Sequence, residues 1–132
     1  MHFFSMRITG DNLDFNSISE KLGIKNAVYH NKGISLLQND EEIVFDEDIW
    51  ESKIEIKDDE SLQNVIDKHV ELLFRCYQYI KELSSTNEIS LWLTVYPDNY
   101  QLNFRLSEKT MKMISQMKIN FDISIMNLHD LY

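Results

Sequence analysis

Apolar and polar residues alternate along several short stretches of the chain, the pattern of strands with one buried face. In residues 4–9, Phe4, Met6 and Ile8 alternate with polar residues. Residues 89–96 are instead apolar or aromatic on both faces, as in an interior strand. The chain is predicted to have five main strands, at residues 4–9, 50–57, 89–96, 101–106 and 119–126.

Helical periodicity is strongest in residues 61–83, where apolar residues recur every three or four positions. A short helix is predicted over residues 16–22, because Ser17 and Glu20 have capping-box spacing and Gly23 can end a helix. A third helix is predicted after Ser107. The acidic residues 58–60 precede the long helix and oppose the positive end of its dipole.

The order of these elements predicts an α+β fold. Turn residues 97–99 join two predicted strands, which favours an antiparallel hairpin. Residues 24–49 are patterned poorly and are expected to form a long connection with one or two short strands. Four of the five predicted strands have a polar outer face. We therefore expect a single domain over residues 1–132, with two or three helices on one face of a largely antiparallel sheet and the other face open.

Composition supports one globular domain and excludes several classes. The 132 residues are 43% hydrophobic and include only three Gly and one Pro. The single Cys cannot form an internal disulfide. The first residues lack the features of a secretory signal, and no apolar run reaches the length of a membrane span. We expect a cytoplasmic protein that does not bind membranes.

The excess negative charge of the chain is confined to one window, residues 39–60. Residues 39–60 hold eleven of the twenty-two Asp and Glu but only two of the thirteen Lys and Arg, so their net charge of −9 equals that of the whole chain. An acidic chain without a basic stripe is a poor candidate for nucleic-acid binding. The window instead favours encounter with a basic partner.

Apolar residues lie among these acids, as in interfaces that combine desolvated anchors with electrostatic steering. The alternative is a solvated surface with an acidic segment preceding a helix. The hypothesis of an interface assigns partner binding to Asp40, Glu41, Glu42, Phe45, Asp46, Glu47 and Asp48.

Motifs for catalysis, cofactors or metals were not found. The acidic window lacks the Gly and the ligand spacing of an EF-hand, and no His pair has zinc-site spacing. His69 and Cys76 share a helical face, but seven residues are about 10 Å along a helix, too far for a hydrogen bond. We expect a buried structural Cys76, a core-edge His69, no cofactor and no enzymatic activity.

Five segments of the chain match a known pattern: MRITGDNLDFNSISEKLGI, HNKGI, DEDIWESKI, VELLFRCYQYIKEL and KINFDISIMNL. Through these segments the chain resembles the bacterial family of domain of unknown function 4279. The resemblance implies a small cytoplasmic α+β domain without assigned activity, and some relatives resemble immunity proteins of bacterial toxin systems. The chain departs from the usual family pattern in lacking a Pro soon after Gly23.

These observations give one leading hypothesis and two rivals. The leading one is a non-enzymatic, immunity-type inhibitor of a basic, nuclease-like toxin domain. The first rival is a ligand-binding domain or unrecognised enzyme that uses the open sheet face. The residues assigned to that face are Arg7, Lys53, Asn103, Arg105 and Asp122. The second rival is a weak homodimer formed through the same face; otherwise we expect a monomer.

Overall fold

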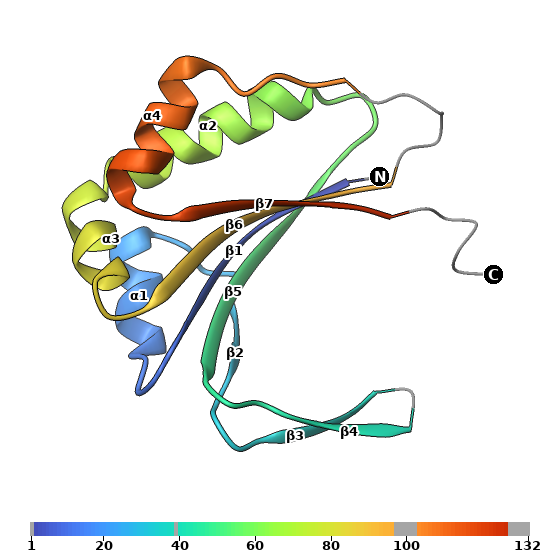
Figure 1. The fold of residues 1–132 in the computed structure, drawn as a ribbon, viewed down its shortest axis with the longest axis vertical. Helices are drawn as coiled ribbons and strands as arrows, with labels where there is room; N and C mark the ends of the chain where they lie inside the picture. The colour runs from blue at the N-terminus through green and yellow to red at the C-terminus, as the bar shows by residue number, and fades with distance from the viewer. Residues whose placement is uncertain (1, 39, 97–102, 127–132) are drawn as a thin grey trace.

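A five-stranded sheet forms the centre of the molecule in a computed structural model that describes residues 2–38, 40–96 and 103–126 (Figure 1). Its strand order is β2-β5-β1-β6-β7. The strands are β1 (His2–Gly10), β2 (Val28–His30), β5 (Asp48–Ile56), β6 (Glu88–Val95) and β7 (Asn120–Ile125). β6 and β7 are parallel, whereas the other neighbours are antiparallel. The predicted α+β fold with a largely antiparallel five-stranded sheet is confirmed, with β6 and β7 as its one parallel pair in the described residues.

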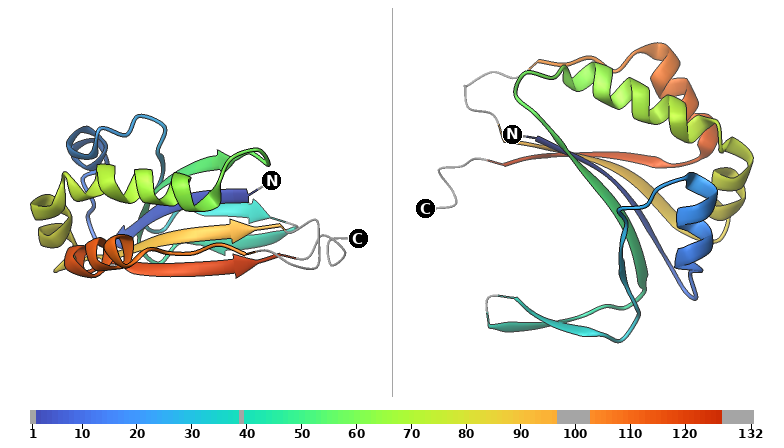
Figure 2. Two further views of the ribbon diagram at one scale, coloured as in Figure 1. Left: turned by 90° about the horizontal axis from the view of Figure 1, so that it is seen from above. Right: turned by 180° about the vertical axis from the view of Figure 1, so that it is seen from behind.

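In the part of the chain that the structure describes, four helices cover one face of this sheet (Figures 1 and 2). They are α1 (Phe15–Leu22), α2 (Leu62–Phe74), α3 (Tyr77–Ser84) and α4 (Glu108–Met117). The core lies between the two layers and includes Ile8, Trp50, Ile66, Ile80 and Leu91, all fully buried. The predicted helix over residues 61–83 is interrupted at Arg75 and Cys76, so this stretch forms two helices, α2 and α3, where one was predicted.

Helix ends follow local chemistry. The side chain of Asp14 accepts a hydrogen bond from Ser17 N at 3.1 Å, so Asp14 caps α1 and the predicted Ser17 capping box was wrong. Gly23 ends α1 with φ of 69°, a left-handed conformation that glycine adopts readily, so its predicted role at the helix end is confirmed. Ser61 and Ser107 cap α2 and α4 in the same manner as Asp14.

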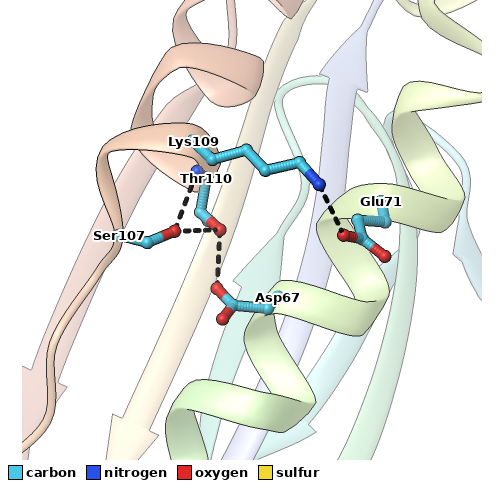
Figure 3. A network of polar contacts seen from close by, with 5 residues as sticks. All are labelled: Asp67, Glu71, Ser107, Lys109 and Thr110. Carbon is cyan, nitrogen blue, oxygen red and sulfur yellow. Dashed lines mark hydrogen bonds and ion pairs between the residues drawn. The ribbon is translucent and has the colours of Figure 1, made fainter.

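A chain of hydrogen bonds fixes α4 to α2 (Figure 3). The buried Thr110 hydroxyl donates to Asp67 Oδ1 at 2.6 Å and accepts from Ser107 Oγ at 3.0 Å. Lys109 adds an exposed ion pair with Glu71, 3.2 Å long. Because Ser107 also caps α4, its hydroxyl couples the start of that helix to its packing on α2.

The predicted strand over residues 101–106 was wrong in its described part, since residues 103–106 lie in no strand. Phe104 and Leu106 still pack against the core, on the helical side. β6 therefore pairs with β1 and β7, and the short β2 supplies the fifth strand. Residues 97–102, including the predicted turn, lie outside the described residues.

A separate hairpin precedes β5 and projects from its first residues. It consists of β3 (Ser35–Gln38) and β4 (Glu41–Val44), which pair only with each other. Figures 1 and 2 show it turned away from the helices, on the side of the open sheet face. The long connection thus holds three short strands, including β2, where one or two were expected.

Candidate functional site

The hairpin of β3 and β4, together with residues 45–47 that follow it, carries six of the seven predicted partner-binding residues. Register pairs Leu37 with Glu42 and Ser35 with Val44, so these four side chains share one face. At the tip, Asp40 has φ of 62°, a conformation that Asp tolerates more readily than most residues. Backbone hydrogen bonds between Gly33, Ile34 and Phe45 continue the pairing to the base of the hairpin.

Apolar side chains on the hairpin are exposed. Leu37 exposes 82% of its surface, Val44 55% and Ile43 37%. An isolated two-stranded hairpin has little stability of its own in water. Its exposed apolar side chains bury little surface in the monomer, so folding of the hairpin does not explain them. Leu37 and Val44 share one face of the hairpin, whereas Ile43 lies on the other face. Since exposed apolar side chains that share a face commonly mark interaction sites, the hairpin is a stronger candidate interface than the open sheet face.

Five carboxylates surround these apolar residues. Asp40, Glu41, Glu42, Asp46 and Glu47 are all exposed, and residues 40–47 include no Lys or Arg. Within the described ranges none of the five makes an ion pair. Their negative potential is therefore uncompensated locally and extends into solvent over about a Debye length.

Phe45 belongs to the base of the hairpin. Its ring stacks on His30 with centroids 4.7 Å apart and planes 16° apart. The residue is half-buried, unlike the exposed apolar side chains nearer the tip. Phe45 can therefore orient the hairpin on β2 and still present part of its surface to a partner.

The prediction that Asp48 binds a partner was wrong. It is only 8% exposed, its Oδ1 accepts from Lys32 N at 2.7 Å, and its Oδ2 accepts from Leu13 N at 3.0 Å. One carboxylate thus ties the start of β5 to two other segments. Asp48 supports the hairpin from within and is not available to a partner.

The open sheet face, the predicted alternative, is lined by an internally satisfied network. Arg7 Nε and a terminal guanidinium nitrogen each lie 2.9 Å from Glu51 Oε2, and the guanidinium lies 5.6 Å from the centre of the Trp92 ring. Trp92 Nε1 donates to Ser124 Oγ at 2.8 Å. These contacts order the face and leave Arg7, Glu51 and the Trp92 N–H already paired.

Only part of the predicted alternative set meets on this face. Lys53 lies over the Phe3 ring at 4.4 Å, and Asp122 is in register with Trp92 on the neighbouring strand. Asn103 and Arg105 do not join them, because residues 103–107 form no strand and run on the helical side. The alternative site therefore reduces to Arg7, Lys53 and Asp122.

His69 and Cys76 are both half-buried on the helical side. His69 Nδ1 lies 2.8 Å from the Val65 carbonyl and must donate to it, since a carbonyl only accepts. The Cys76 thiol donates to the Lys21 carbonyl at 3.5 Å. Cys76 is thus less buried than predicted.

The described residues contain neither a membrane-spanning helix nor a metal-binding cluster. None of the helices there is both long and apolar enough to span a membrane. No group of three or more His, Cys, Asp and Glu among them is arranged to hold a metal ion.

Sequence reasoning noted Val44 among the apolar residues of the acidic window but assigned neither Val44 nor Leu37 to the binding set, although both are largely exposed. The sequence feature that could have identified them is their position: they flank the acidic residues 40–42 in a segment without clear periodicity. Without periodicity, the sequence gives no reason to expect the apolar side chains of this segment to be buried in the core.

Comparison with known proteins identifies one family. A family model described as a domain of unknown function, DUF4279, matches residues 1–128. No curated protein and no solved structure matches the chain. Because the match spans nearly the whole sequence, the chain belongs to the DUF4279 family.

Proposed function

We propose that the chain is a non-enzymatic protein-binding domain that docks its hairpin of β3 and β4 onto a basic partner protein. The observation that carries the proposal is the exposure of Leu37, Ile43 and Val44 among five carboxylates without ion pairs in the described structure. The apolar side chains supply desolvated contacts, and the carboxylates steer a cationic surface toward them.

More specifically, we propose an immunity-type inhibitor of a nuclease-like toxin, acting in the cytoplasm. A nuclease binds phosphates through Lys and Arg, so its active surface has the charge that this hairpin attracts. Covering that surface would exclude the nucleic acid and inhibit the enzyme without any chemistry by the inhibitor. The support is charge complementarity together with the resemblance of some family relatives to immunity proteins.

The test begins with affinity capture from a lysate of the native host. The baits are the wild type and a variant with Asp40→Asn, Glu41→Gln, Glu42→Gln, Asp46→Asn and Glu47→Gln. A matched control neutralises five exposed acids elsewhere: Glu20, Glu55, Asp59, Glu82 and Glu88. Asp48 stays unchanged in both, because its hydrogen bonds are structural.

We expect a basic protein that the wild type and the control retain and that the hairpin variant loses. The purified partner should bind the wild type with an affinity that falls steeply between 50 mM and 500 mM salt, since exposed charges are screened. A nuclease activity of that partner should be inhibited by the wild type in proportion to binding. Equal binding by all three baits, or no dependence on salt, would contradict the proposal.

A further inference from the structure

A cavity of about 480 Å³ lies on the helical side of the sheet, away from the hairpin. It is bounded by the inner faces of β1 and β5, by α2, and by residues 22–26 after α1. This volume is within the usual range for small-molecule sites in proteins. The cavity belongs neither to the hairpin nor to the open face.

The sequence of β5 accounts for the space. Its inward-facing positions are Asp48, Trp50, Ser52, Ile54 and Ile56. Ser52 is buried and is the smallest of these side chains, so the sheet surface is lower there than beside Trp50. The break after α2 leaves Arg75 and Cys76 at the edge of the same cavity.

The inner wall is apolar. Phe4 and Met6 from β1, Ile54 from β5 and Leu73 from α2 line it, and all except the half-buried Ile54 are buried. These side chains would accept an alkyl or aryl group, whose transfer from water is favourable by about 25 cal/mol per Å² of apolar area. The cavity therefore suits a ligand with an apolar body.

The rim of the cavity is cationic. Lys25 and Arg75 line it and are exposed, and neither makes an ion pair with any described residue. No Asp or Glu lines the cavity, although the chain carries a net charge of −9. The local charge is thus opposite in sign to that of the protein, and it favours an anionic group.

Hydrogen-bonding groups lie between the apolar wall and the cations. Ser52 Oγ donates to Asn26 Oδ1 at 3.2 Å, which fixes the Asn26 amide beside the cavity. Its NH₂ group makes no hydrogen bond to any described residue and can donate to an oxygen. An amide donor beside two cations matches a carboxylate, which only accepts hydrogen bonds.

We propose that this cavity binds a small amphipathic carboxylate, with its apolar part against Phe4, Met6 and Ile54 and its carboxylate near Lys25, Arg75 and Asn26. A medium-chain fatty acid is the simplest example. The site is separate from the hairpin, so it does not depend on the proposed protein partner.

Calorimetric titration with decanoate tests the proposal, and decanol of the same chain length is the neutral control. We expect saturable binding of decanoate at one site and weaker binding of decanol. In the double variant Lys25→Gln and Arg75→Gln, affinity for decanoate should fall roughly ten-fold, since two charge-assisted contacts are lost. The charge-matched variant Lys68→Gln and Lys112→Gln, whose residues do not line the cavity, should bind like the wild type.

Cys76 reports the location of the ligand because it is the only cysteine and lines the cavity. Saturating decanoate should slow its alkylation by iodoacetamide at least several-fold, as measured by intact mass. The variant Leu37→Ser should bind decanoate normally, which excludes binding to the exposed hairpin. The proposal is overturned by absence of binding up to 1 mM decanoate, by equal affinity for decanol, by unchanged affinity in the double variant, or by unchanged alkylation.

Discussion

The two sheets of the molecule differ in what covers them. The five-stranded sheet buries one face beneath four helices, and Trp50, Ile56 and Leu91 are fully inaccessible there. The hairpin sheet pairs only with itself and leaves Leu37 and Val44 largely exposed. Apolar residues therefore serve folding in one sheet and are available for association in the other.

The two tryptophans test this comparison most strongly, because they lie on opposite faces of the large sheet. Trp50 is fully buried and its Nε1 donates to Ser19 Oγ at 3.0 Å. Trp50→Ala should lower the free energy of unfolding by about 3–5 kcal/mol in urea titrations. Trp92→Ala, on the open face, should cost about half as much. Equal losses would mean that the open face is as tightly packed as the core.

Asp48 marks the boundary between the two sheets, and its replacement should have the next largest effect. Asp48→Asn turns one acceptor oxygen into a donor facing a backbone N–H, so the unfolding free energy should fall by about 2 kcal/mol. Asp46→Asn removes a charge from an exposed position of the same window and should change stability by less than about 0.5 kcal/mol. Equal effects of the two substitutions would refute the structural role of Asp48.

The helical layer should respond less to the loss of one hydroxyl. Thr110→Val keeps the shape of the side chain but removes the hydrogen bond to Asp67 and the acceptor for Ser107. We expect a loss of about 1 kcal/mol in the same titrations. Thr94→Val on the open face should stay within about 0.5 kcal/mol. A neutral Thr110→Val would show that apolar packing alone holds α4 on α2.

The smallest effect on stability is expected on the hairpin. Leu37→Ser should change the unfolding free energy by less than about 0.5 kcal/mol, because little of Leu37 is buried. The same substitution should weaken binding of the proposed partner by ten-fold or more, measured by calorimetry. If Leu37→Ser instead destabilised the monomer by more than about 1 kcal/mol, the hairpin would belong to the folded core.

Sequence periodicity correctly located elements that bury one face and expose the other. The alternation in residues 4–9 and 50–57 located most of β1 and β5, and Ser107 marked the start of α4. Alternation failed in residues 103–106 because Phe104 and Leu106 do face the core, but from an extended segment without a strand partner. A pattern of burial carries no information on hydrogen-bond pairing.

The candidate site was predicted in part for a similar reason. The acidic charge around the hairpin was visible in the sequence, but Asp48 looked like the other acids. Continuing the alternation of Trp50 and Ser52 backwards would have placed Asp48 on the inner face, where it lies. The exposure of Leu37 and Val44 depends on the path of the hairpin away from the sheet, which short-range patterns do not encode.

The central position of β1 sets the order in which this protein can fold. His2 pairs with Ile56 on one side and with Val95 on the other, so β1 leaves the ribosome long before either partner strand exists. Contacts between residues so distant in sequence slow folding, because the intervening loops must close before the pairing is gained. Until then Phe4, Met6 and Ile8 stay uncovered, and the nascent chain is open to aggregation or chaperone binding.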